Sequence, residues 1–273
     1  MDALNGFFNS LFNIVLYPIE GLGALAVLTI ISMIFMPLSM LFFKRFSSQK
    51  GIANAKGQIK GHMIAIRIYQ DDLFVVAKSV VMVLVNNFKY LFLNFAPFLP
   101  LSVPFVVVVA QLVIRFGFAP IPVEERDLSG MLAGQGTMIE VAFAEGHEED
   151  ASKLSVVLPE GLTALSELVP GPSDGLAFME VAGTKAGTWD VEFQLTGGEV
   201  VTKRVVVGTM ENAERLMQPE RVQDFWMSWL WPAEDTFASD SSFARIAIAY
   251  PDRELAYMWD GAGGVFLMFL LVA

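Results

Sequence analysis

The chain has 273 residues, of which 54% are hydrophobic and none is cysteine, so disulfide bonds, thiolate catalysis and cysteine metal sites are excluded. Residues 1–123 hold nine basic residues (Lys or Arg) and four acidic residues (Asp or Glu). Residues 124–273 hold nine basic and 25 acidic residues. These two parts suit two environments, anionic lipid and water, and the acidic part argues against a nucleic-acid partner.

Residues 21–43 form the first candidate membrane span. This segment holds 23 residues without a charge, and a helix of that length crosses a hydrocarbon core of about 30 Å. Before it, Asn5, Asn9 and Asn13 recur every four positions within residues 2–17. This spacing predicts a helix that lies in the headgroup plane. The alternative is a helix packed against partner subunits.

Residues 91–114 form the second candidate span, although Pro97, Pro100 and Pro104 lie within it. A membrane helix tolerates proline where neighbouring helices or water satisfy the freed carbonyl groups. Residues 73–88 before it show a one-sided apolar pattern, which predicts a second in-plane helix or, again, a helix packed against partners.

The connection at residues 44–90 is basic, with Asp71 and Asp72 as its acidic residues. The positive-inside rule therefore places it in the cytoplasm, and we expect the N-terminus and everything after Arg115 on the periplasmic side of a bacterial inner membrane. Six of its cations are expected to set this topology and contact lipid headgroups: Lys44, Arg45, Lys50, Lys56, Lys60 and Arg67.

Residues 124–210 show the period of two that is typical of strands. Residues 188–195 place Trp189, Val191, Phe193 and Leu195 on one side, and Gly197-Gly198 then turns the chain into a second strand at 199–207, which predicts a hairpin. Further strands are predicted at 138–144, 154–158, 177–181 and 243–250. Several short strands in this space favour an all-β, immunoglobulin-like sandwich outside the membrane.

Residues 211–260 are interpreted as a segment that returns the chain to the bilayer, with a helix predicted at 211–235. Tryptophan prefers the membrane–water boundary, so Trp226, Trp229, Trp231 and Trp259 are candidate interfacial anchors, with an ordinary aromatic packing patch as the alternative. Residues 261–273 are uncharged and are expected to begin a third, truncated transmembrane helix.

Catalytic residues are hard to assemble from this sequence. His62 and His147 fall on opposite sides of the membrane by the predicted topology, and the acidic run at 145–150 lacks the alternating oxygen ligands of a calcium loop. We therefore expect no catalytic residues, no metal and no cofactor. The candidate spans hold no charge inside them, which argues against transport.

Several short motifs resemble the YidC-type membrane insertase superfamily over the first 120 residues or so. They are Tyr17-Pro-Ile-Glu20, Met36-Pro-Leu38, Gln58-Ile-Lys60, Tyr69-Gln-Asp-Asp72 and Phe118-Ala-Pro120. The resemblance implies a membrane helical domain with a cytoplasmic helical hairpin and a hydrophilic groove. Bacterial members carry an arginine in the first core span, where this chain has Ser32 or Met33, so Ser32, Asn94 and Gln111 are the candidate groove residues.

These observations predict a membrane α-helical anchor, with two to three transmembrane helices and interfacial helices, that carries the outer sandwich domain. The expected function is that of a non-catalytic subunit within a larger respiratory, photosynthetic or secretory complex. Its expected partners are membrane lipids and other integral membrane subunits. The alternative is an insertase or membrane chaperone, and a ligand-binding outer domain on a passive anchor ranks third.

Overall fold

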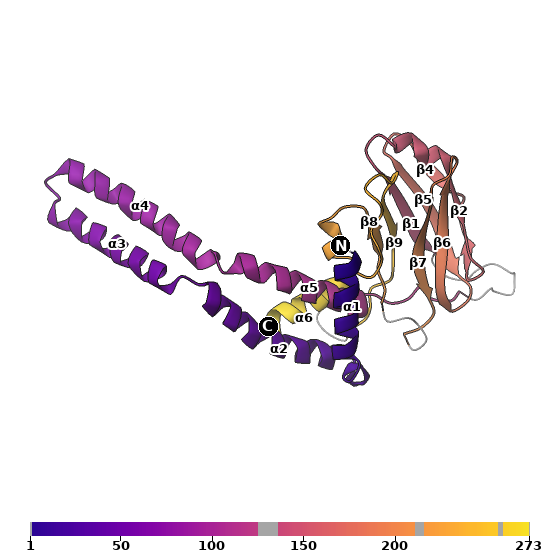
Figure 1. Ribbon diagram of the computed structural model, residues 1–273, viewed down its shortest axis with the longest axis horizontal. Helices are drawn as coiled ribbons and strands as arrows, with labels where there is room; N and C mark the ends of the chain where they lie inside the picture. The colour runs from indigo at the N-terminus through magenta and orange to yellow at the C-terminus, as the bar shows by residue number, and fades with distance from the viewer. Residues whose placement is uncertain (1, 125–135, 211–215, 256–258, 273) are drawn as a thin grey trace. The chain divides into compact units, whose positions relative to one another are not determined.

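A computed structural model describes residues 2–124, 136–210, 216–255 and 259–272 of the chain (Figure 1). Two compact units are formed, one by Met1–Ile31 with Val106–Val272 and the other by Ser32–Phe105. The helices are α1 (Asp2–Leu16), α2 (Ala24–Phe46), α3 (Gln49–Ile68), α4 (Leu73–Phe95), α5 (Phe98–Phe116) and α6 (Gly261–Val272).

Two helical stretches are long and apolar enough to cross a membrane: Ala24–Phe46, and Leu73–Phe116, which α4 and α5 share. The first contains the expected span at 21–43 almost entirely. Residues 91–114, predicted as one span with a kink in its first part, fall on two helices, because α4 ends at Phe95, the chain turns at Ala96-Pro97 and α5 begins at Phe98. Proline lacks the N–H that would continue the helical ladder, so the break falls there.

Helices α3 and α4 form an antiparallel hairpin within the unit Ser32–Phe105 (Figure 1). The Asp72 carboxylate starts α4 by accepting hydrogen bonds from the backbone N–H groups of Phe74 and Val75, at 3.0 and 3.1 Å. Residues 73–88, predicted as a separate in-plane helix, are thus the first part of one 23-residue helix.

The remaining chain folds into two antiparallel sheets. The larger has the order β3-β5-β1-β9-β8, with β4 also paired to β5, and the smaller has the order β2-β6-β7. Their bounds are β1 (Thr137–Phe143), β2 (Leu154–Val157), β3 (Leu162–Ala164), β4 (Val169–Gly171), β5 (Leu176–Gly183), β6 (Gly187–Leu195), β7 (Val200–Val207), β8 (Glu220–Val222) and β9 (Phe243–Ile248).

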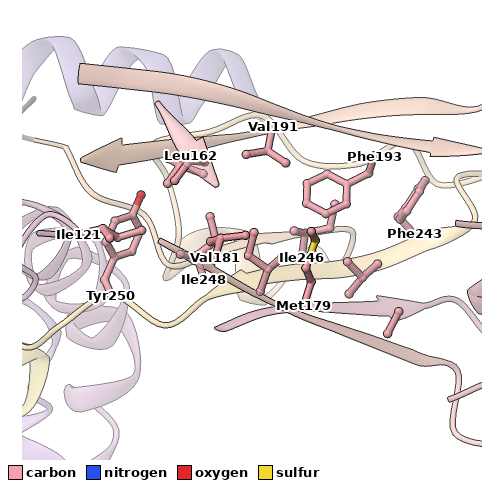
Figure 2. Close-up of a cluster of buried hydrophobic side chains, with 14 of the residues drawn as sticks. Ile121, Leu162, Met179, Val181, Val191, Phe193, Phe243, Ile246, Ile248 and Tyr250 are labelled. Atoms are coloured by element: carbon pink, nitrogen blue, oxygen red, sulfur yellow. The ribbon is translucent and has the colours of Figure 1, made fainter. Parts of the chain in front are cut away.

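Both sheets contribute side chains to one hydrophobic core (Figure 2). Val191 and Phe193 of β6 are fully buried there together with Ile246 of β9, which confirms the inward side predicted from the period of two. The predicted hairpin of β6 and β7 is also confirmed, with Trp189 opposite Val205. Gly197 and Gly198 at its turn have φ values of 133° and 122°, which favour glycine.

The sheets extend beyond the predicted boundary at residue 210, because β9 pairs with β1 and β8 pairs with β9. The helix predicted at 211–235 is wrong over the described residues 216–235, which contain β8 and a single 3-10 turn, Met227–Trp229. Pro219 and Pro232 interrupt any long helix in this stretch. Residues 211–215 lie outside the described part of the chain.

Candidate functional site

The asparagine side of α1 faces other parts of its own unit, with Asn5 buried there. Asn5 and Asn9 donate hydrogen bonds to the carbonyl oxygens of Ser228 and Pro232, at 3.4 and 2.7 Å, and Asp2 accepts one from the Thr236 N–H at 3.2 Å. A helix lying in the headgroup plane would turn these amides to water. Here the opposite, apolar side of α1 is exposed instead, including Phe7, Leu11 and Ile14.

Arg115, in the last turn of α5, is the centre of a buried polar cluster with α1. Its guanidinium donates to Asn13 Oδ1 at 2.6 Å and to Gln111 Oε1 at 2.5 Å. Gln111 in turn donates to Asn9 Oδ1 at 2.7 Å. Gln111 and Arg115 are one helical turn apart, as are Asn9 and Asn13, so each helix presents one matched pair of side chains.

The cluster holds a positive charge without a negative partner. Arg115 is only 3% exposed, and within the described part of the chain each of its hydrogen-bond acceptors is a neutral oxygen. The ring of Phe12 adds a cation–π contact at 6.0 Å. Burying a charge is costly unless it is fully hydrogen-bonded, so the amides of α1 are required to keep Arg115 in place.

The end of α5 is also joined directly to the sheets. Met217 donates its N–H to the Ile114 carbonyl at 2.9 Å, and Phe118 forms a bridge with Asp252. Arg253 donates to the Arg115 carbonyl at 3.3 Å, and partial burial lowers the pKa of Arg253 from its ordinary value. Arg115 therefore lies where α1, α5 and the sheet domain meet.

Two of the three predicted groove residues, Asn94 and Gln111, form hydrogen bonds to different groups. Asn94 donates to the Tyr90 carbonyl of its own helix at 2.7 Å, and Gln111 belongs to the Arg115 cluster. Ser32 is fully buried. The side chains of Asn94 and Gln111 are therefore each engaged with other groups, and the groove stays a prediction of the resemblance.

The six predicted headgroup-contacting cations are all exposed. Lys44 and Arg45 end α2, while Lys50, Lys56, Lys60 and Arg67 lie along α3. Within the described residues none of them forms an ion pair, and Lys56 lies over the Tyr90 ring at 5.2 Å. Their charges are therefore available to an external partner.

The four predicted tryptophan anchors fall into two pairs. Trp226 and Trp259 are exposed. Trp229 and Trp231 are partly buried, and Trp231 packs on Phe118 with ring centroids 6.1 Å apart. The indole nitrogens of this second pair are buried without a hydrogen-bond partner in the described residues. Two of the four thus fit the predicted anchor role and two fit the packing alternative.

A pocket of about 430 Å³ opens within the unit Ser32–Phe105 at the base of the hairpin. Methionine and aromatic side chains make up most of its apolar wall, and Lys44 contributes the charge. The lining residues are Met36, Ser39, Met40, Phe43, Lys44, Gln49 and Leu101.

A buried ion pair in the sheet domain was not predicted. Lys203 of β7 is fully buried, and it donates to the Glu234 carboxylate and, at 2.7 Å, to the Gln218 carbonyl. Burial lowers the pKa of Lys203, and Glu234 opposes this effect. The sequence contained a signal for this pair, because Lys203 is two residues from Val201 and two from Val205 and therefore lies on the same, inward side of β7.

Across the described residues no group of three or more His, Cys, Asp or Glu side chains could hold a metal ion. The Arg115 cluster and the Lys203–Glu234 pair each bury a charged side chain, and Arg245 forms further, partly buried ion pairs with Glu140 and Glu220. Comparison with protein-family models, curated proteins and solved structures finds no match to this chain.

Proposed function

We propose that this chain is a non-catalytic integral membrane subunit whose helices α2 and α5 cross the membrane. The exposure of the long apolar helices carries the proposal. Only 28% of the apolar window of α2 and 33% of that in Leu73–Phe116 are buried. Each large apolar side chain left in water loses the stabilisation of about 1.5–3 kcal/mol that its burial would contribute. Contact with lipid or with membrane partner helices removes that cost.

In this proposal residues 44–90 are cytoplasmic, and the N-terminus and the sheet domain are periplasmic, in a bacterial inner membrane. The exposed cations that follow α2 support this orientation. The sheet domain, which we propose to be an immunoglobulin-like sandwich, would carry its acidic surface on the outer side.

The orientation can be tested with single cysteines, because the chain has none of its own. We expect Glu167→Cys, on the exposed surface of the sheet domain, to react with an impermeant maleimide on spheroplasts. Lys60→Cys on α3 should react only after the membrane is permeabilised. Labelling of Lys60→Cys on intact spheroplasts would contradict the proposed orientation. Solubility of the full chain without detergent would contradict the proposed membrane location.

The proposed role is to pack within a larger complex and stabilise it, with the sheet domain docking on partner subunits. An exposed apolar tip at Phe225, Trp226, Met227 and Leu230 supports docking, because contiguous apolar residues of this kind mark interaction sites. Purification of the tagged chain in mild detergent should recover stoichiometric membrane partners that an unrelated tagged membrane protein does not recover. A monodisperse monomer without partners would contradict this role.

A second candidate function is that of an insertase or membrane chaperone. The α3–α4 hairpin corresponds to the helical hairpin that the sequence resemblance implies, and the methionine-lined pocket lies at its base. Flexible methionine side chains suit varied apolar ligands. A photocrosslinker at Met40 should then capture nascent membrane proteins, whereas one at the exposed Leu41, outside the pocket lining, should capture fewer. Equal or absent capture would exclude this candidate.

A further inference from the structure

The side of α4 that packs against α3 includes Tyr90 and Leu93, but its most buried residues are polar. Ser79 and Asn86 are the two buried residues of α4, at 5% and 7% exposed, and α3 is the element that α4 contacts. They are seven residues apart, which is the repeat of a coiled-coil seam. Ala55 is the buried residue on α3. A water-exposed hairpin normally buries large apolar side chains in such a seam.

The opposite side of α4 also carries large apolar side chains. These form an outer stripe of Phe74, Val81, Val85, Phe88 and Phe92, all of them exposed. Their spacing of seven, four, three and four residues keeps them on one side of a helix with about 3.6 residues per turn. On the same geometry this outer stripe lies opposite Ser79 and Asn86. Helix α4 therefore exposes a stripe of large apolar side chains while its two most buried residues are polar, which is unlike a helix hairpin in water.

Cations accompany this outer stripe. Lys56, Lys60 and Arg67 are spaced by four and seven residues and lie exposed on one side of α3, while Lys78 and Lys89 are exposed at the edge of the outer stripe on α4. The acidic residues of the hairpin, Asp71 and Asp72, lie at its turn. The hairpin thus combines an unpartnered apolar stripe with a nearly uniform positive charge.

We propose that the α3–α4 hairpin lies along the cytoplasmic surface of the bilayer, with the outer stripe of α4 among the acyl chains and its cations on anionic phospholipid headgroups. This inference rests on the proposed membrane location. Long cationic side chains reach the headgroups while their helix sits at the acyl boundary, and clusters of Lys and Arg bind anionic lipid.

Helix α4 does not cross the membrane in this arrangement. Because α3 runs antiparallel along α4, a crossing α4 would carry Lys56, Lys60 and Arg67 into the hydrocarbon, where each charge is strongly disfavoured. A crossing by α4 is also unnecessary. Helix α5 has 19 residues and at about 1.5 Å per residue is already long enough to span.

Depth-dependent quenching tests the arrangement on the full chain in vesicles of phosphatidylcholine and phosphatidylglycerol. An environment-sensitive fluorophore is placed at Phe74→Cys, Val81→Cys, Phe88→Cys or Phe92→Cys, with Ile34→Cys on α2 as the membrane reference and Gly57→Cys on α3 as the aqueous reference. We expect all four α4 positions to be quenched equally, by nitroxides near the headgroups and not by nitroxides at the bilayer centre.

Three results would overturn the proposal. Quenching that changes steadily in depth from Phe74 to Phe92 would mean that α4 crosses the bilayer. Labels exposed to water, or shielded without nitroxide quenching, would mean that the stripe is free or covers a protein, a second copy included. If Ile34→Cys is also unquenched, the membrane location itself fails, so the two proposals can be told apart.

The charge component is tested by the Lys56→Gln/Lys60→Gln/Arg67→Gln variant. Each Lys or Arg near an anionic surface contributes a factor of about five to binding, so the ratio of inserted to free α4 label should fall by about two orders of magnitude. The Lys153→Gln/Lys185→Gln variant, altered on the sheet domain, should match the parent chain. An unchanged ratio in the first variant would contradict headgroup binding.

Discussion

The Arg115 guanidinium is held by side chains from two helices that are far apart in sequence. Asn13 and Gln111 each accept one of its N–H groups, and the planar fork of arginine can reach both at once. An ammonium group offers no such fork. The residue therefore acts as a clamp between α1 and α5 rather than as a flanking charge of the span.

Replacing Arg115 should release α1 from α5. In Arg115→Gln the buried Gln111 oxygen loses its donor, which costs about 1–3 kcal/mol, and the hydrogen bond to Asn13 of α1 is lost as well. Arg115→Lys should fall between this variant and the parent chain. Amide hydrogen exchange across α1 in detergent measures the effect, with Arg45→Gln on exposed α2 as the matched control. Unchanged exchange in Arg115→Gln would show that the clamp contributes nothing.

The sequence predicted the asparagine side of α1 but not what it faces. The four-residue spacing of Asn5, Asn9 and Asn13 is a local signal, whereas their partners Ser228, Pro232 and Arg115 are more than 100 residues away in sequence. The role of Arg115 could not be predicted for the same reason, and the sequence marks it only as the residue after which the chain is expected on the periplasmic side. Spacing identifies a polar side of a helix, and only the tertiary fold determines whether that side meets water or another polar group.

The Lys203–Glu234 pair is the second residue-scale feature with a measurable consequence. Glu234→Ala leaves the Lys203 ammonium fully buried without a counter-ion, and we expect a loss of about 3–5 kcal/mol. Lys203→Met/Glu234→Ala removes both charges and should recover most of this loss. Denaturant unfolding of the sheet domain checks both variants.

The exposed pair Lys185–Glu160, whose charged atoms are 3.9 Å apart, provides the control for that experiment. Glu160→Ala should change stability by less than about 1 kcal/mol, because water screens an exposed pair. Equal losses in Glu160→Ala and Glu234→Ala would refute the argument from burial.

At the scale of elements, local signals predicted β6 and β7 well and the helix breaks poorly. Alternation in β6 is strict because one side faces the core, as Val191 and Phe193 show. The sequence did not show which of Pro97, Pro100 and Pro104 would end a helix. The chain turns at Pro97, whereas Pro100 and Pro104 lie within α5. Strands β3, β4 and β8 have three residues each, too few for any period to show.

Two of the three glycines of α3, at positions 51 and 57, give an element-scale prediction. Gly57→Ala meets no atom within 4 Å, so it should stabilise the helix by up to about 1 kcal/mol. Gly51→Ala places its Cβ 3.2 Å from Leu93 Cδ1 of α4 and 2.7 Å from Ser48 Oγ, which should cancel that gain. Exchange rates of the α3 and α4 amides compare the two variants directly, and equal effects would mean that α4 does not pack at Gly51.

At the scale of the whole molecule, the sheet domain begins before its first strand. Ile121 is buried in the core, its N–H donates to the Val206 carbonyl at 3.0 Å, and its carbonyl accepts from the Gly208 N–H at 2.8 Å. The segment that follows α5 is therefore part of the domain and not a linker.

A fragment of residues 117–255 should accordingly be more stable than one of residues 136–255. Loss of Ile121 and of its backbone pairing with β7 leaves a cavity in the core, and a buried large-to-small change of this kind costs about 2–5 kcal/mol. Denaturant midpoints by circular dichroism compare the two fragments. The same midpoint in both would place Ile121 outside the cooperative core.

The pairing of β1 with β9 has a consequence for the order of folding. Strand β1, at the centre of the larger sheet, pairs with β9, which is synthesised about 100 residues later. Helix α1 bonds to Ser228 through Asn5, 223 residues earlier in the chain. Contacts this distant form late and slowly. Helix α1 and strand β1 are thus synthesised well before the residues they pair with, so a nascent chain must keep them from aggregating until Ser228 and Ile248 have been made.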